Sequence, residues 1–259
     1  MSPFAFSNVE NQLMILLLAS IRPGAALIAA PVFGARQVPL QLRLVLALAI
    51  GVPASGISQM TLPDGGMVSL AGTMLVASEA LIGLAIGFTI QIAMAAAAVA
   101  GETVSNTMGL GFAAMTDPQS GQATPAVGQF LSVLATLIFL AADGHLAVIG
   151  VVLDTYRVLP PGEAWLRPSS LYALVEFGGL AFSAGLIIAL PVATATVIVQ
   201  IVMGIVSRSA PTLNLFAVSL PASLIAGIVL MAIATPVMAE AIGFALSDAL
   251  QFTRTLAGG

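Results

Sequence analysis

Residues 67–100 read MVSLAGTMLVASEALIGLAIGFTIQIAMAAAAVA, an apolar run with no proline and a single charged residue, Glu79. A helix over this run is about 50 Å long at about 1.5 Å per residue, whereas the hydrocarbon core of a bilayer is about 30 Å thick. We therefore expect a helix that tilts, projects out of the bilayer, or lies against protein for much of its length.

Glu79 shares a helix face with two glycines, Gly83 and Gly87, at a spacing of four residues. A carboxylate in the middle of a membrane helix costs about 3 kcal/mol on an insertion scale, and the apolar side chains of residues 72–92 offset this cost by about 3–5 kcal/mol. Glycines four residues apart let a second helix approach closely, and Glu79 can then hydrogen-bond across the contact. We interpret this face as a helix-packing surface; a proton or ion relay through Glu79 is the alternative.

The composition excludes an ordinary soluble protein. Apolar residues make up 59% of the 259 residues, charged residues only 7%, and the mean hydropathy is +1.10, whereas soluble domains carry about 25% charged residues. The chain is therefore an integral membrane protein or the core of a membrane-linked assembly. Its seven basic residues, all arginines, and its net charge of −4 provide no basic patch for nucleic acid.

Residues suited to metal binding or catalysis are scarce. The chain has no cysteine and only one histidine, His145, which excludes disulfides and thiolate metal sites. Asp143 and His145 lack an obvious nucleophile or further ligand beside them, so we predict no catalytic, cofactor-binding or metal-binding residues, and no enzymatic activity. An intramembrane hydrolase that uses His145 is the alternative.

Six hydrophobic blocks predict an all-α membrane protein with about six helical segments, arranged as hairpins with broken helices. Arg22-Pro23-Gly24 interrupts the first block and predicts a kink or two half-helices, and Asp143-Gly144-His145 cuts the fourth. Arg22 itself can snorkel, pair with an acid or cap exposed carbonyls. We treat residues 1–259 as a single domain. The blocks are residues 13–33, 42–57, 67–100, 126–152, 171–206 and 212–250.

Between the third and fourth blocks, residues 101–125 read GETVSNTMGLGFAAMTDPQSGQATP, the longest polar, glycine-bearing interruption of the chain. Its glycines permit positive φ angles and therefore a tight fold. Its apolar centre, residues 108–115, predicts a loop that rests on another apolar surface. A surface connector whose apolar residues cap a helix end is the alternative.

Short motifs along residues 13–225 together resemble the FliR family of the flagellar export gate and its injectisome counterparts. Each motif is unspecific alone, but their order and spacing form a specific pattern. Thr212 departs from it, because the family often has glutamine after the Ala-Pro pair, so a contact made by that glutamine does not carry over. The motifs are Arg22-Pro23-Gly24, Pro31–Gly34, Val38-Pro39 with Arg43, Glu79 with Gly83 and Gly87, Gly109–Ala113 with Asp117-Pro118, Asp143-Gly144-His145, Pro160 with Gly162, Ala189–Pro191, Arg208 with Ala210-Pro211, Asn214 and Phe216, and Pro221.

The resemblance implies a non-enzymatic subunit of a helical ring built with FliP-like and FliQ-like subunits, and an FlhB-like subunit as a further partner. It implies a place in the bacterial inner membrane, in contact with lipid, at the flagellar basal body, where the ring passes unfolded flagellar proteins out of the cytoplasm. It implies no cofactor and no nucleic acid partner. In the closed state a loop plugs the lumen, and by position this loop is residues 108–117.

The resemblance also assigns roles to individual residues. The apolar plug is expected to consist of Met108, Gly109, Leu110, Gly111, Phe112 and Met115. Helix packing and buried polar contacts are expected of Arg22, Glu79, Gly83, Gly87, Arg208 and Asn214.

Two other functions stay open from the sequence. One is an export-gate subunit of an injectisome, within the same family. The other, from a different class, is a proton-coupled secondary transporter of small solutes, with helices broken at Pro23 and Pro191 and with Glu79 as the coupling residue.

Overall fold

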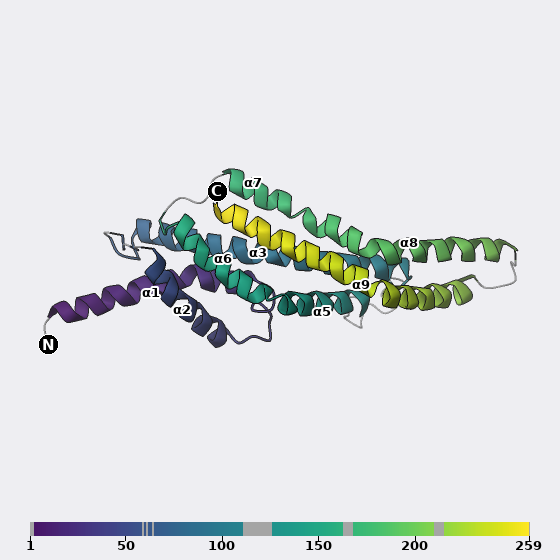
Figure 1. Cartoon of the computed structure of the whole chain (residues 1–259), viewed down its shortest axis with the longest axis horizontal. Helices are drawn as coiled ribbons and strands as arrows, with labels where there is room; N and C mark the ends of the chain where they lie inside the picture. The colour runs from purple at the N-terminus through teal and green to yellow at the C-terminus, as the bar shows by residue number, and fades with distance from the viewer. Residues whose placement is uncertain are drawn as a thin grey trace. The chain divides into compact units, whose positions relative to one another are not determined.

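The computed structural model of the chain describes residues 3–58, 60, 62–63, 65–110, 126–162, 168–209 and 215–258. Every regular element in these ranges is an α-helix (Figure 1), so the expected all-α fold is confirmed. The helices are α1 (Pro3–Ala29), α2 (Leu40–Ile57), α3 (Leu70–Thr107), α5 (Ala126–Ala141), α6 (Gly144–Val158), α7 (Pro168–Phe177), α8 (Leu180–Ser209) and α9 (Leu215–Gly258).

The six hydrophobic blocks correspond to membrane-length helical segments. Among the described residues, five segments are long and apolar enough to cross a membrane, and α5 with α6 forms one further bent pair. The break in that pair falls at Asp143, which has a left-handed backbone with φ 53° and whose carbonyl accepts hydrogen bonds from the first turn of α6. The five segments are Val9–Ala29, Leu40–Ile57, Leu70–Thr107, Pro168–Val206 and Ser219–Leu256.

The chain divides into two compact units. The first comprises Met1–Ile92, Leu140–Gly178 and Ser247–Gly259, and the second comprises Ala93–Phe139 and Gly179–Leu246.

In the first unit, α1 and α2 form an antiparallel hairpin held together by small residues. A Cβ atom on Gly24 would lie 3.5 Å from the Cβ of Ala47, and one on Gly51 would lie 3.2 Å from the backbone of Ser20. The contact moves backward along α1 as it moves forward along α2, so the helices run in opposite directions. An apolar cluster joins this hairpin to α6 through Leu27, Ala47, Ile50, Phe33, Leu46, Ile149 and Leu153.

In the same unit, α3 packs closely against α1. A Cβ atom on Gly83 would lie 2.2 Å from the carbonyl oxygen of Arg22, and one on Gly87 would lie 2.5 Å from the carbonyl oxygen of Ala26. The contact advances by four residues on both helices, so α1 and α3 run parallel. At this separation, only glycine at positions 83 and 87 leaves room for the α1 backbone.

In the second unit, the C-terminal part of α3 contacts both α5 and α8. A Cβ atom on Gly101 would lie 2.3 Å from Cα of Gly128 in α5, and one on Gly185 of α8 would lie 2.8 Å from Cβ of Val99. The helix α3 ends at Thr107, well beyond the expected end at residue 100. The buried positions 101, 104, 105 and 108 recur at helical spacing among the polar residues that follow Ala100, so α3 buries one face up to its end.

Prolines lie inside four of these helices without ending them. The first block is one helix, α1, and not two half-helices, although Pro23 lies within it. Membrane helices tolerate proline where other groups bond to the carbonyl that the missing N–H leaves free. The interior prolines are Pro23 in α1, Pro53 in α2, Pro191 in α8, and Pro221 and Pro236 in α9.

Candidate functional site

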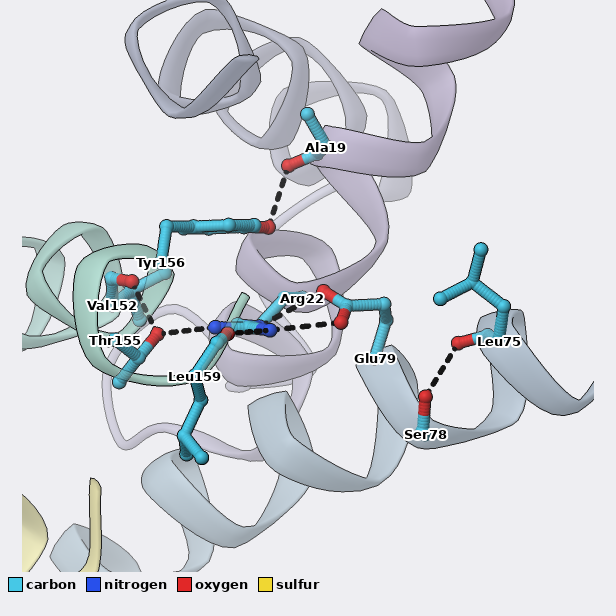
Figure 2. A network of polar contacts seen from close by, with 9 residues as sticks. All are labelled: Ala19, Arg22, Leu75, Ser78, Glu79, Val152, Thr155, Tyr156 and Leu159. Atoms are coloured by element: carbon cyan, nitrogen blue, oxygen red, sulfur yellow. Dashed lines mark hydrogen bonds and ion pairs between the residues drawn. The ribbon is translucent and has the colours of Figure 1, made fainter. Parts of the chain in front are cut away.

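Two polar sites stand out within this apolar chain, one in each unit. The first, which we call the Arg22 cluster, consists of Arg22, Glu79, Thr155, Tyr156 and Leu159 and joins α1, α3 and the C-terminal end of α6 (Figure 2). The second, which we call the loop base, consists of Thr107, Met108 and Gly109 at the end of α3, with their contacts Gln200 in α8 and Ser223 and Gly227 in α9.

Arg22 and Glu79 form a bidentate ion pair that is fully enclosed. The Nε atom of Arg22 donates to Oε2 of Glu79 at 2.9 Å, and one terminal nitrogen donates to Oε1 at 2.8 Å. The two side chains are 0% and 1% exposed. Paired N–H donors match the geometry of a carboxylate, and the pairing offsets part of the cost of removing both charges from water.

The opposite side of the guanidinium faces α6. One terminal nitrogen of Arg22 donates to the hydroxyl of Thr155 at 2.8 Å, and the other donates to the carbonyl of Leu159 at 3.0 Å. Thr155 in turn donates to the carbonyl of Val152 at 2.6 Å. The positive charge thus lies at the C-terminal end of α6, where the helix dipole favours a cation.

Tyr156 completes the cluster in two ways. Its ring lies 4.1 Å from the Cζ atom of Arg22, as a cation–π contact, and its hydroxyl donates to the carbonyl of Ala19 at 2.9 Å. Ala19 is four residues before Pro23, which has no N–H to donate to that carbonyl. The hydroxyl of Tyr156 therefore replaces the helical hydrogen bond that Pro23 removes, and Figure 2 shows it reaching α1 from α6.

The loop base is the point where α3 ends. Gly109 has a φ of +82°, the N–H of Gly109 donates to the carbonyl of Asn106 at 3.1 Å, and the N–H of Leu110 donates to the carbonyl of Ser105 at 3.0 Å. This is a Schellman motif, in which glycine adopts the left-handed conformation that terminates a helix. The helix therefore stops at a defined residue, immediately before the predicted plug.

Side chains from α8 and α9 hold the remaining carbonyls of the loop base. The side-chain amide of Gln200 in α8 donates to the carbonyl of Thr107. The hydroxyl of Ser223 in α9 is shared between the carbonyl of Met108 at 3.2 Å and the carbonyl of Leu220 in its own helix at 3.0 Å. The side chain of Met108 is 2% exposed and lies against Gly227 of α9. Met108 is thus part of the interior of the second unit.

The other predicted site residues have different settings. Leu110 is half-buried, and Arg208 lies in the last turn of α8 with an exposed side chain, so its packing role stays a prediction. Gly111, Phe112, Met115 and Asn214 lie outside the described residues, and their roles also stay predictions.

Several residues of both sites were not identified from the sequence. Thr155 and Tyr156 are polar groups in an apolar helix, and the missing N–H of Pro23 was a usable signal, since it requires a donor from elsewhere. Ser223 and Gly227 lie within a long apolar helix, where a serine and a glycine give no local pattern. The described residues contain no group of three histidine, aspartate or glutamate side chains placed to bind a metal.

Comparison with known proteins gives a separate finding. The family described as "Bacterial export proteins, family 1" matches residues 13–249. The chain is 36% identical to the flagellar biosynthetic protein FliR of Escherichia coli (strain K12) over 219 residues, which cover 85% of this chain and 83% of that protein. It is 30% identical to FliR of Caulobacter vibrioides over 86% of this chain and 88% of that protein. It is 28% identical to FliR of Bacillus subtilis (strain 168) over 93% of each.

Proposed function

We propose that this chain, which belongs to family 1 of the bacterial export proteins together with the FliR proteins, is a non-enzymatic subunit of the flagellar export gate whose loop after Met108 closes the channel. Membership of this family makes the chain a membrane-embedded component of the flagellar export apparatus. The proposal adds to this FliP-like, FliQ-like and FlhB-like partners, a place in the inner membrane at the flagellar basal body, and unfolded flagellar proteins as the cargo.

The observation that carries the proposal is the match over residues 13–249. It runs through both compact units and through the segment between α3 and α5, which supports the treatment of the chain as one domain. The relatives named above are flagellar biosynthetic proteins, and this favours the flagellar over the injectisome branch.

The Arg22 cluster supports a structural role for Glu79 over a coupling role. Both carboxylate oxygens of Glu79 accept hydrogen bonds from Arg22 inside a fully buried site. A carrier of protons must exchange them with water, and this ion pair is sealed by three helices. In addition, α1 and α8 are continuous through Pro23 and Pro191, so the broken helices that the transporter alternative requires do not occur at these positions.

The loop base supports a plug that begins at a fixed helix end. A seal needs apolar side chains that exclude water and ions, and flexible Met residues with Leu and Phe suit contact with varied peptides. The sequence after Gly109 supplies such residues. Because α3 ends in a Schellman motif at Gly109, the loop starts from a defined place in the second unit.

Deletion of residues 109–115 tests the proposal. We expect the deletion to raise ion conductance across the inner membrane well above the wild-type level. The conductance is measured in cells in which the variant is the only copy of this protein. Co-purification with FliP-like and FliQ-like subunits serves as the control for assembly. A variant that assembles normally and conducts no more than the wild type would show that this loop is not the seal.

A further inference from the structure

We propose that the exposed side of α9 around Glu240 is a docking surface for a helix of another membrane subunit, and that this helix brings an arginine or lysine side chain to Glu240. We call this surface the Glu240 face. The inference rests on the proposed function in one respect, since it takes the chain to be one subunit of a larger complex. The face consists of Ile233, Val237, Glu240, Gly243 and Phe244, all in the second unit.

The Glu240 face is the side of α9 that the described part of the chain leaves uncovered. Its large side chains recur at spacings of three or four residues, which places them on one side of a helix. Ile242, two residues after Glu240 and therefore on the opposite side, is buried. The exposed fractions are 71% for Ile233, 57% for Val237 and 62% for Phe244.

Glu240 places a requirement on whatever covers this face. It lies near the middle of the candidate span Ser219–Leu256, its side chain is exposed, and it forms no ion pair or hydrogen bond with any described residue. A carboxylate that faces hydrocarbon is costly, so lipid is a poor cover. The apolar side chains one turn before and after Glu240 make a water-filled path an equally poor one. An apolar helix with a single cationic side chain satisfies both the carboxylate and its neighbours.

The Arg22 cluster shows how this chain itself satisfies an acid in the middle of an apolar helix. Gly83 lies one turn after Glu79, α1 approaches closely across it, and Arg22 pairs with the carboxylate in an enclosed site. Gly243 has the corresponding place beside Glu240, three residues on. A Cβ atom on Gly243 would meet nothing within 4 Å, so the space next to this part of α9 is open. A glycine on an uncovered face lets a second helix approach, and the negative charge beside it selects a helix that carries a positive one.

Photo-cross-linking from the Glu240 face identifies its cover directly. Phe244→p-benzoylphenylalanine keeps an aromatic ring at an exposed position and leaves Glu240 unchanged. The variant is irradiated in cells that assemble the whole complex, and the adducts are identified by mass spectrometry. We expect an adduct with another membrane subunit of the complex. Adducts found only with lipid, with exported protein or within the chain itself would overturn the proposal.

Removal of the charge tests the ion pair. Glu240→Gln and Glu240→Leu each leave the partner's cation without its counter-ion, so the amount of partner subunit recovered with a given amount of this chain should fall by at least about tenfold. If the face met lipid, Glu240→Leu would leave this recovery unchanged or raise it, and the proposal would be wrong.

Asp248→Asn is the matched control for the charge variants. It is the same kind of change on the same helix, and Asp248 is exposed in the polar last turns of α9, near Gln251 and Arg254. Recovery of the partner subunits should stay at the wild-type level. A loss equal to that of Glu240→Gln would show that the effect does not depend on the Glu240 face, against the proposal.

Gly243→Leu tests the close approach separately from the charge. The new side chain enters open space in this chain, so the chain should still accumulate in the membrane, whereas the docking helix should no longer reach Glu240. We expect recovery of the partner subunits to fall as in Glu240→Gln. Wild-type recovery from Gly243→Leu would contradict a helix packed across this glycine.

The outcomes separate this inference from the proposed function. If the unaltered chain does not co-purify with FliP-like or FliQ-like subunits, the proposed function is wrong. If the unaltered chain co-purifies with them and the Glu240 and Gly243 variants do so equally well, the proposed function stands and the Glu240 face is not the docking surface.

Discussion

Removal of one hydroxyl, with Tyr156→Phe, tests the explanation of how α1 passes through Pro23. The variant keeps the ring against Arg22 and deletes only the donor that lies 2.9 Å from the carbonyl of Ala19. Tyr156 is 0% exposed, so water does not replace the lost donor. A buried carbonyl left without a partner costs about 1–3 kcal/mol, and we expect Tyr156→Phe to lower the stability of the chain by that amount.

The measurement is thermal stability of the chain in detergent, co-purified with its partner subunits. For a chain of this size, about 1 kcal/mol corresponds to about 2–4 °C in midpoint temperature, so Tyr156→Phe should lower the midpoint by about 2–12 °C. The readout is the temperature at which half of the chain stays soluble after heating.

Pro23→Ala supplies the control. The substitution restores a backbone N–H four residues after Ala19, so the carbonyl regains a helical donor. In the Pro23→Ala background, Tyr156→Phe should therefore cost less than about 1 kcal/mol, and this coupling between the two sites is the test. A full-sized loss in both backgrounds, or no loss in either, would refute the account of Tyr156 as the replacement donor.

Two further predictions concern the contacts between α1 and α3. Glu79→Gln leaves the buried charge of Arg22 without its counter-ion and should lower the stability of the chain by about 3–5 kcal/mol. The double variant Arg22→Met with Glu79→Met removes both charges and should lose less stability than Arg22→Met alone or Glu79→Met alone, as measured by the same thermal assay. Gly83→Ala places a Cβ atom 2.2 Å from the carbonyl oxygen of Arg22 and should cost about 1–3 kcal/mol or more through overpacking. Gly150→Ala is the control, because a Cβ atom there meets nothing within 4 Å, and it should leave the thermal stability unchanged. An equal loss of stability in Gly83→Ala and Gly150→Ala would contradict the close approach of α1 and α3.

The membrane-helical fold was predictable because length and hydrophobicity alone decide it. Each hydrophobic block corresponds to a candidate span or to the bent pair α5 and α6. The end of α3 was not predictable from the same signal. Residues 101–107 are mostly polar, but Val104 and Ser105 are fully buried, and only the neighbouring helices reveal which face of a polar segment is covered.

The sites were predictable only in part, because their partners lie far along the chain. The spacing of Glu79, Gly83 and Gly87 indicates a packing face but not the helix that covers it. Arg22 meets Glu79 at a separation of 57 residues and Thr155 at a separation of 133 residues. For Arg22, the sequence allowed snorkelling, pairing or capping, and the structure combines an ion pair with a hydrogen bond to the carbonyl of Leu159.

The order in which the Arg22 cluster is synthesised has a consequence for biogenesis. Arg22 leaves the ribosome 57 residues before Glu79 and 133 residues before Thr155, and an unpaired arginine at the centre of a membrane helix costs about 3 kcal/mol on an insertion scale. When α1 and α2 enter the membrane, the guanidinium of Arg22 therefore has no counter-ion and the carbonyl of Ala19 has no hydrogen-bond donor. Translation of α3 supplies the counter-ion Glu79, and translation through the end of α6 then supplies the acceptor Thr155 and the hydroxyl of Tyr156 that donates to Ala19, so we expect a nascent chain that stops before Thr155 to be less stable in the membrane than one that includes α6.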